Sequence, residues 1–246
     1  MREKILLINI LFIVLTFNLQ AQVELDIETG KLWNGYNNVE VPLDKGTRFS
    51  LTDNATVNSN AFFRLQLLLT AAEIHTIRIL YAPLKSVSHG TFKEDVSFNG
   101  KQFISRSDFT GIYKFNSYRI TYRYNFSTTG SFLWGLGLTA KLRDAKIEMI
   151  SDGTQSAKTD FGFVPLINFN LEWFPQEKYS FQLAGDALFS PYGQGRAEDV
   201  LLAFRYHWSR STIKAGYRIL EGGADVSEVY NFTLFHYAVI GITVEL

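Results

Sequence analysis

The sequence predicts an all-β fold: a transmembrane, up-and-down antiparallel β-barrel of about ten strands. Three observations lead to it. About ten segments alternate between apolar and polar residues, their connections alternate between short and long, and their apolar faces are unusually aromatic. The chain has 246 residues, of which 15% are aromatic, and such side chains suit the pleated surface of strands. Short turns at one rim and long loops at the other produce this rhythm of connections.

The start of the chain has the layout of a secretory signal peptide. A charged stretch precedes an apolar run over 5–17, and Ala21 then offers a small residue for cleavage. The run is shorter than the ~20 residues that a spanning helix needs, although a membrane anchor is the alternative. We predict a cleaved signal peptide over 1–21 and a mature barrel over 22–246.

Five predicted strands occupy the first part of the mature chain: 23–30, 59–71, 74–84, 117–126 and 131–144. Their apolar faces carry, in order, Val23, Leu25 and Ile27; Phe63, Leu65, Leu67 and Leu69; Ile77, Ile79 and Tyr81; Tyr118, Ile120, Tyr122 and Tyr124; and Phe132, Trp134, Leu136, Leu138 and Leu142. The opposite faces carry isolated charges set among Gly, Thr and Asn. Each segment therefore has the period of a strand with two different environments.

Five more predicted strands follow: 160–173, 181–186, 203–209, 212–220 and 235–246. Their apolar faces carry Phe161, Phe163, Ile167, Phe169, Leu171 and Trp173; Phe181 and Leu183; Phe204, Tyr206 and Trp208; Ile213, Tyr217 and Ile219; and Ala238, Ile240, Ile242, Val244 and Leu246. Pro165 cannot donate a ladder hydrogen bond. We expect a bulge there, or a place where no neighbouring strand requires the donor.

The connections favour a barrel with two different rims. The short ones lie near 71–74, 127–130, 174–178 and 209–211, and the longer ones near 34–58, 85–111, 151–158, 190–197 and 221–230. Asn99-Gly100, within the second long connection, predicts a type I′ hairpin turn. Eight or twelve strands are the alternatives to ten. The long connections leave adhesion, ligand capture and surface masking open.

The two faces indicate lipid outside and a polar interior. Closing the sheet leaves no unpaired backbone edge in hydrocarbon. Aromatic residues beside short turns fit an interfacial girdle: Phe126, Phe132, Trp173, Phe174, Tyr179 and Trp208. A soluble periplasmic ligand-binding barrel is a further alternative.

On these features, residues 22–246 resemble a small Gram-negative outer-membrane β-barrel protein. The last segment, FHYAVIGITVEL, resembles the assembly signal of such proteins, although it ends in Leu246 where the signal usually ends in Phe. The resemblance implies an outer-membrane location with periplasmic turns and extracellular loops. It also implies contact with membrane lipid and lipopolysaccharide, and recognition of the last strand by the barrel-assembly machinery. We expect a monomer.

The inward faces predict a network of charges that fills a narrow lumen, because small barrels fill their interiors with side chains. Its predicted members are Glu24, Asp26, Glu28, Arg64, Arg78, Arg119, Arg123, Lys141, Arg143, Glu172, Asp186, Arg205, His207, Lys214 and Arg218. Such a network favours a structural or surface-interaction role. A small anion or solute pore, which would be porin-like, is the alternative.

An enzymatic alternative rests on three residues. His207, Ser209 and Glu221 resemble the H-x-S…E arrangement of outer-membrane lipid A 3-O-deacylases, in which they would be base, nucleophile and orienting acid. Strand parity places His207 and Ser209 inside the barrel, and Glu221 falls roughly 30 Å away at ~3.4 Å per residue. Omptin proteases share the strand number, but their Asp pairs and Asp-x-His dyad find no counterpart. We do not favour an enzyme.

Composition excludes several other classes. Lys+Arg and Asp+Glu number 24 each, so the chain lacks the basic excess of a nucleic-acid-binding protein. It has no Cys, and its four His show no metal-ligand spacing. The Gly-containing stretches do not lead from a strand into a helix, so they do not predict phosphate-binding loops. No cofactor and no metal are expected.

Overall fold

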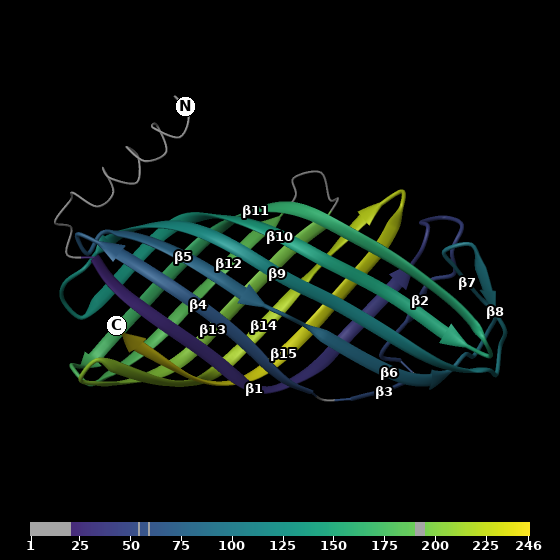
Figure 1. Ribbon diagram of the computed structural model, residues 1–246, viewed down its shortest axis with the longest axis horizontal. Helices are drawn as coiled ribbons and strands as arrows, with labels where there is room; N and C mark the ends of the chain where they lie inside the picture. The colour runs from purple at the N-terminus through teal and green to yellow at the C-terminus, as the bar shows by residue number, and fades with distance from the viewer. Residues whose placement is uncertain (1–20, 54, 59, 190–194) are drawn as a thin grey trace, which may run out of the picture.

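The protein forms a closed antiparallel barrel of ten long strands (Figure 1). The computed structural model describes residues 21–53, 55–58, 60–189 and 195–246. The wall strands are β1 (Ala21–Glu40), β4 (Asn60–Ala71), β5 (His75–Ala82), β9 (Asp108–Ser127), β10 (Phe132–Ser151), β11 (Thr154–Gln176), β12 (Tyr179–Phe189), β13 (Gly195–Trp208), β14 (Ser211–Val226) and β15 (Val229–Glu245). Each pairs with the next wall strand and β15 pairs with β1, so the predicted fold class and strand count are confirmed.

Five short strands complete the sheet structure. β6 (Lys85–Thr91) follows β5 and pairs with the first part of β9. β2 (Phe49–Ser50) pairs with β1, and β3 (Ala55–Val57) pairs with β6. β7 (Val96–Phe98) and β8 (Lys101–Phe103) form a hairpin of their own. The predicted signal peptide over 1–21 lies outside the described residues except for Ala21, which begins β1.

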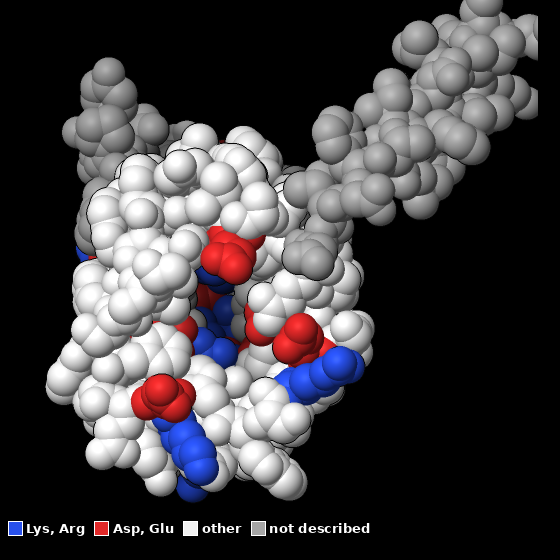
Figure 2. All heavy atoms as spheres, turned by 90° about the vertical axis from the view of Figure 1, so that its left-hand side faces the viewer, with Lys and Arg blue, Asp and Glu red and all other residues white. Residues whose placement is uncertain are grey.

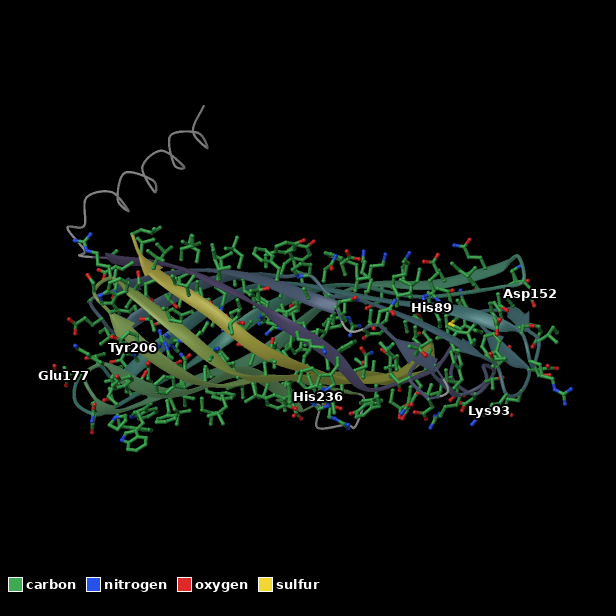
Figure 3. The ribbon with its side chains drawn as sticks, turned by 90° about the horizontal axis from the view of Figure 1, so that it is seen from below. His89, Lys93, Asp152, Glu177, Tyr206 and His236 are labelled. Atoms are coloured by element: carbon green, nitrogen blue, oxygen red, sulfur yellow. The ribbon has the colours of Figure 1, made fainter. Side chains whose placement is uncertain are left out.

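The two ends of the barrel differ (Figure 3). Glu177, between β11 and β12, marks one end, which we call the turn end; Asp152, between β10 and β11, marks the other, which we call the hairpin end. Short connections at 72–74, 128–131, 177–178 and 209–210 join strands at the turn end, where β1 begins and β15 ends. The predicted rim of short turns is therefore present.

Four of the five predicted long loops at the hairpin end are wrong in extent, and most of the fifth, 190–197, lies outside the described residues. Residues 151–158 and 221–230 belong almost entirely to strands, joined by two-residue turns at 152–153 and 227–228. β1 continues to Glu40, and 85–111 contains β6, the β7–β8 hairpin and the start of β9. These strands were not predicted because, toward the hairpin end, their apolar side chains point inward and their polar side chains outward. This is the reverse of the pattern in the rest of the wall.

The wall is longer than a membrane requires. β9 and β10 have 20 residues each, whereas a transmembrane strand needs about 9–11. Among the described residues, no helix is long and apolar enough to cross a membrane. We call the part of the wall next to the turn end the membrane half, and the part next to the hairpin end the outer half.

In the membrane half, the outward face is apolar and the inward face is polar. Leu138 of β10 points outward and is 70% exposed, whereas Lys141 of the same strand points inward and is 3% exposed. Many other outward side chains of the wall are also apolar and exposed, among them Ile120, Tyr122, Leu136, Ile167, Leu202 and Ile240. This polarity suits a wall with hydrocarbon outside.

In the outer half, the polarity is reversed. Ile147 and Met149 of β10 point inward and are buried, while the neighbouring Glu148 forms an outward ion pair with Lys146 at 2.6 Å. The β7–β8 hairpin and the segment after β1 fill the interior there with an apolar core of Val39, Val41, Leu51, Phe92, Val96, Phe98, Phe103, Phe109, Met149 and Phe235. The outer half is thus built like a water-soluble barrel, and its core plugs the lumen.

Pro165 lies within an unbroken stretch of β11. Its partner on β10 is Ala140, with no bulge in that ladder. On the other side of β11, the described pairing with β12 runs only as far as Ile167 and Ala187. Among the described residues, therefore, no residue of β12 pairs with Pro165, and no hydrogen bond from its backbone nitrogen is needed on that side.

The β7–β8 turn confirms the predicted type I′ geometry, since Asn99 and Gly100 both have positive φ, 47° and 78°. A Cβ on Gly100 would meet nothing within 4 Å, so only backbone strain opposes a side chain there. We expect Gly100→Ala to weaken the hairpin by about 1–2 kcal/mol. Hydrogen exchange of the Phe98 and Lys101 amides should accelerate while exchange in the wall strands stays unchanged; equal exchange in variant and wild type would contradict this.

Candidate functional site

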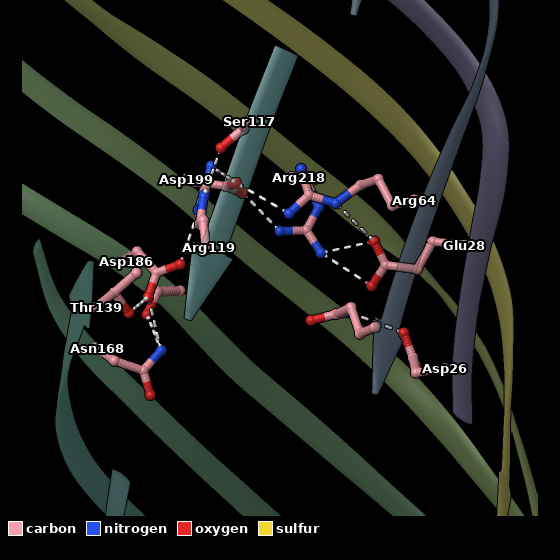
Figure 4. Close-up of polar contacts among 12 residues, drawn as sticks. Asp26, Glu28, Arg64, Ser117, Arg119, Thr139, Asn168, Asp186, Asp199 and Arg218 are labelled. Carbon is pink, nitrogen blue, oxygen red and sulfur yellow. Dashed lines mark hydrogen bonds and ion pairs between the residues drawn. The ribbon is translucent and has the colours of Figure 1, made fainter. Parts of the chain in front are cut away.

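The lumen of the membrane half holds most of the charged residues that the sequence predicts to point inward. Eleven of the fifteen lie within ion-pair distance of an opposite charge in the lumen: Asp26, Glu28, Arg64, Arg78, Arg119, Glu172, Asp186, Arg205, His207, Lys214 and Arg218. They come from eight strands of the wall, and Figure 4 shows the central part of the cluster.

Glu28 of β1 is the most enclosed carboxylate of the cluster, with 0% exposure. Arg218 donates two hydrogen bonds to it at 2.8 and 2.9 Å, Lys214 donates one at 2.7 Å, and the Arg64 Nε lies 3.3 Å away. Lys214 also donates to Asp26, two residues before Glu28, at 2.7 and 2.9 Å. Three cations therefore neutralise two neighbouring inward carboxylates of one strand.

Asp199 of β13 connects three arginines. It pairs with Arg218 at 2.6 Å, Arg119 at 2.7 Å and Arg64 at 3.0 Å, and is 2% exposed. Sequence reasoning missed this residue, because the predicted strand began only at 203. Because apolar residues follow Asp199 on its own face of β13, the polar-inward pattern that identified the other strands is absent there.

Asp186 of β12 accepts hydrogen bonds from four side chains, and Figure 4 shows Arg119, Thr139 and Asn168 around it. Arg78 donates at 2.7 and 2.9 Å and Arg119 at 2.7 Å, while Thr139 and Asn168 each donate at 2.8 Å. A buried carboxylate is stable only with such partners. Arg119 thereby links the carboxylates on β12 and β13 into one continuous network.

Glu172 is the partner of Arg205, nearer the turn end. Arg205 donates to both carboxylate oxygens at 2.7 and 2.8 Å, and Ser180 donates to one of them at 2.5 Å. The Ser180 Oγ also lies 2.7 Å from Nε2 of His207, whose Nδ1 contacts Thr212 at 3.1 Å. Glu172 Oε1 lies 3.5 Å from the same Nε2 nitrogen. In an acid–His–Ser relay the acid and the serine bind opposite nitrogens of the imidazole, whereas here both lie at Nε2. The arrangement is therefore a structural hydrogen-bond chain.

Four predicted members lie outside the network, and two of them, Arg143 and Lys141, lie farther from the turn end than Glu24 and Arg123. Arg143 pairs with Asp160 at 2.6 Å at the border of the outer half, and its side chain is 29% exposed. Lys141 makes no ion pair among the described residues, and its Nζ lies 4.5 Å from the centre of the Phe115 ring. Both sit where the inward face changes from charged to apolar, so the acids of the network do not reach them.

The predicted girdle needs one correction. Trp173 and Trp208 are 51% and 68% exposed on the outside, as expected for residues beside short turns. Phe174 instead lines the lumen and packs on the His207 ring at 5.1 Å between ring centres. It has the same parity as Glu172, so the alternation places it inside.

The alternative catalytic set is not assembled. Ser209 lies in the turn after β13, with φ of 54°, and His207 lies two residues before it. Glu221 lies ten residues beyond Ser211 on β14, about 34 Å away at ~3.4 Å per residue. It faces outward and pairs with Arg196 at 2.6 Å. These three residues cannot act together on one substrate.

The lumen is a well that opens at the turn end. Figure 2 looks into this opening, where acidic and basic side chains lie inside the hollow. The well has a volume of about 660 Å³, and Glu24, Arg123 and Arg205 contribute to its lining. The pairs of Glu28 and Asp199 form its floor, and the apolar core of the outer half lies beyond them. Within the described residues, no group of three or more potential ligands is arranged to hold a metal ion.

An apolar, aromatic outer face around a charge-paired lumen defines the class: the chain has the fold of small Gram-negative outer-membrane β-barrel proteins. Among solved structures, the outer-membrane protease OmpT of Escherichia coli aligns with a TM-score of 0.54 at 10% identity, covering 92% of this chain and 97% of that one. At this identity the similarity concerns the fold alone.

Two further barrels align more loosely. The attachment invasion locus protein Ail of Yersinia pestis gives a TM-score of 0.42 at 10% identity, covering 92% of this chain and 99% of that one. The transport unit of the autotransporter AIDA-I of Escherichia coli gives 0.43 at 9% identity, covering 94% and 92%. No protein-family model and no curated protein matches the chain.

Proposed function

We propose that this protein is an integral outer-membrane barrel with a structural or surface-interaction role, and that its lumen does not conduct. In this proposal the turn end faces the periplasm and the hairpin end projects from the cell. Strands β9 and β10 exceed the membrane span by about as many residues as the span itself needs. The outer half would thus present a rigid, plugged surface to the medium.

Two closures in series carry the proposal. The first is the ion-pair network, in which Glu28, Arg119 and Asp199 are at most 4% exposed. The second is the apolar core, in which Phe98, Met149 and Phe235 have 0% exposure. A conducting path would have to break buried ion pairs and also wet a packed hydrophobic plug, and both steps are costly.

The proposal includes a route to the membrane. The N-terminal signal peptide directs export, and the apolar β15 is the strand that the barrel-assembly machinery would recognise. The outward aromatic face fits lipid and lipopolysaccharide as its surroundings. The closed wall leaves each strand of the membrane half paired, which favours a monomer.

Conductance tests the proposal. The mature chain, extracted from membranes with detergent and inserted in a planar lipid bilayer, should give no single-channel steps in potassium chloride. Vesicles that contain it should retain small sugars and anions as well as empty vesicles do. Discrete steps or solute release would contradict the closed lumen, and recovery of the chain in the wash supernatant instead of the membrane would contradict the whole proposal.

A further inference from the structure

Apart from Arg210, Glu73 and Glu245, which are exposed at its mouth, the described lining of the well at the turn end has one basic and one acidic side chain that the ion-pair network leaves unused. Arg123 of β9 and Glu24 of β1 both line it, and among the described residues neither lies within ion-pair distance of an opposite charge. We propose that this well binds a small zwitterion of the amino-acid type. Its carboxylate would bind Arg123 and its ammonium group would bind Glu24.

Arg123 is held in place before any ligand arrives. Its Nε donates to Oδ1 of Asn125 at 2.9 Å. The Asn125 amide in turn donates to the carbonyl oxygen of Glu73 at 2.9 Å and to Thr76 at 3.1 Å. Within the part of the chain that the structure describes, the two terminal nitrogens of Arg123 have no hydrogen-bond partner. They form the planar fork that suits a carboxylate.

The other arginines of the well are already occupied. Arg78 bonds to both oxygens of Asp186, and Arg205 bonds to both oxygens of Glu172. An incoming anion would therefore have to compete with a resident carboxylate at either of them. Among the described residues that line the well, Arg123 and Arg210 can bind a carboxylate without displacing a resident one, and Arg123 is the one that is part-buried, since Arg210 is exposed at the mouth.

Glu24 is the inward residue of β1 that follows Asp26 toward the mouth of the well. Lys214 pairs with Asp26 and Glu28 at 2.7 Å each, so this cation is already committed. Glu24 lies opposite Leu68 on β4, which in turn lies opposite Arg78 on β5. Its carboxylate lines the well, and among the described residues no cation lies within ion-pair distance of it.

The spacing of the two groups fits a small molecule. Arg123 lies three strands from Glu24 around the wall, about 14 Å at ~4.8 Å per strand, and one inward position nearer the mouth. Two long side chains that reach into the well from these strands leave room for a few atoms between their charges. A volume of about 660 Å³ also admits a residue-sized side chain.

Charge selects the zwitterion over a simple anion. A phosphate at Arg123 would face the unpaired carboxylate of Glu24 across the same well, and like charges repel strongly where little water intervenes. Asp26 and Glu172 are already neutralised by Lys214 and Arg205, so the well offers a phosphate no free cation to offset this repulsion other than the exposed Arg210. A zwitterion adds no net charge and matches both unused groups. Since the well is closed beyond its floor, the ligand would enter and leave through the turn end.

Binding of free amino acids to the detergent-solubilised mature chain tests this site. Saturation-transfer NMR and calorimetry would use glycine and alanine as zwitterions, with acetate, methylammonium and inorganic phosphate as single-charge probes. We expect saturable binding of glycine and alanine, and at least about tenfold weaker binding of the other three probes. Arg123→Gln and Glu24→Gln should each weaken glycine binding by a similar factor.

Glu228→Gln, at the hairpin end and outside the well, is the matched control and should bind glycine like the wild type. Heat-modifiable migration on cold SDS gels would verify that every variant forms the barrel. The proposal fails if glycine and alanine do not bind, if phosphate or acetate binds as tightly, or if both well variants bind like the control. Because binding needs no conductance, these outcomes are independent of the closed-lumen experiment.

Discussion

Replacing Asp199 with Asn is expected to lower the free energy of unfolding of the barrel by about 3–5 kcal/mol, because it breaks a buried charge network from one side. Asp199 is 2% exposed and pairs with Arg218, Arg119 and Arg64 at 2.6, 2.7 and 3.0 Å. Asn keeps the shape of the side chain, so packing changes little. It removes the charge and turns an amide donor toward arginine donors.

The balance of charge around Asp199 sets the size of the effect. The connected cluster has five cations and four carboxylates: Arg64, Arg78, Arg119, Lys214 and Arg218 against Asp26, Glu28, Asp186 and Asp199. The variant would hold five cations with three carboxylates, away from bulk water. Forming such a network stabilises a protein little, because the charged groups lose their contacts with water as they pair. Removing one partner is costly, because the remaining charges stay buried without compensation.

Glu228→Gln provides the matched control, with the same carboxylate-to-amide change. Glu228 pairs with Lys158 at 2.9 Å and is 77% exposed, and the hydrogen bond from Lys158 lowers the pKa of its carboxyl. Solvent and salt screen such a pair, so we expect no measurable change. Urea unfolding in lipid vesicles, followed by tryptophan fluorescence, measures both variants. Equal stability of the two would contradict the argument, whereas Arg64→Gln should restore part of the loss in Asp199→Asn by removing one excess cation.

The fold of the membrane half was predictable because its two faces meet different solvents. In β10, Phe132, Trp134, Leu136, Leu138 and Leu142 alternate with Gly, Thr and Lys, and the strand was predicted from this pattern. Beyond Leu142 the alternation continues with the faces exchanged, as Asp144, Lys146 and Glu148 point outward and Ile147 and Met149 inward. A search for one continuous apolar face therefore ends the strand at 144, seven residues early.

Of the plug in the outer half, only the turn of the β7–β8 hairpin was predictable from the sequence. Asn99-Gly100 specifies a turn through residues next to each other, so the hairpin could be inferred. The packing of Phe98 in one core with Met149 and Phe235 depends on contacts between distant segments. No short pattern encodes such contacts, and the segment was therefore predicted as a loop.

The lumen shows the same division between local and long-range information. Strand parity identified Glu28, Lys214 and Arg218 as inward residues, because parity depends only on neighbours in the sequence. Their pairing joins β1 to β14 across 186 and 190 residues, which only closure of the barrel brings together. Asp199 escaped because apolar residues share its inward face, and the unused Arg123 and Glu24 became recognisable only when every other partner was assigned.

Exchanging an outward residue for arginine should be costly in the membrane half of β10 and nearly neutral in its outer half. Leu138 is 70% exposed in the membrane half, so Leu138→Arg places a charge in hydrocarbon and should cost about 2–4 kcal/mol. Ile150 is 36% exposed on the same face of the outer half, where the surrounding solvent would be water. Ile150→Arg should change the free energy of unfolding by less than about 0.5 kcal/mol.

The inward face provides the reciprocal comparison. Met149 has 0% exposure within the apolar core, so Met149→Arg should be strongly destabilising, although Lys141 on the same inward face is a native cation. Equilibrium unfolding of all three variants in phosphatidylcholine vesicles measures these differences. If Ile150→Arg costs as much as Leu138→Arg, the outer half lies in lipid and the exchange of faces does not mark a solvent boundary. If only Leu138→Arg and Met149→Arg are costly, the membrane ends between positions 142 and 147 of β10, where the two faces exchange polarity.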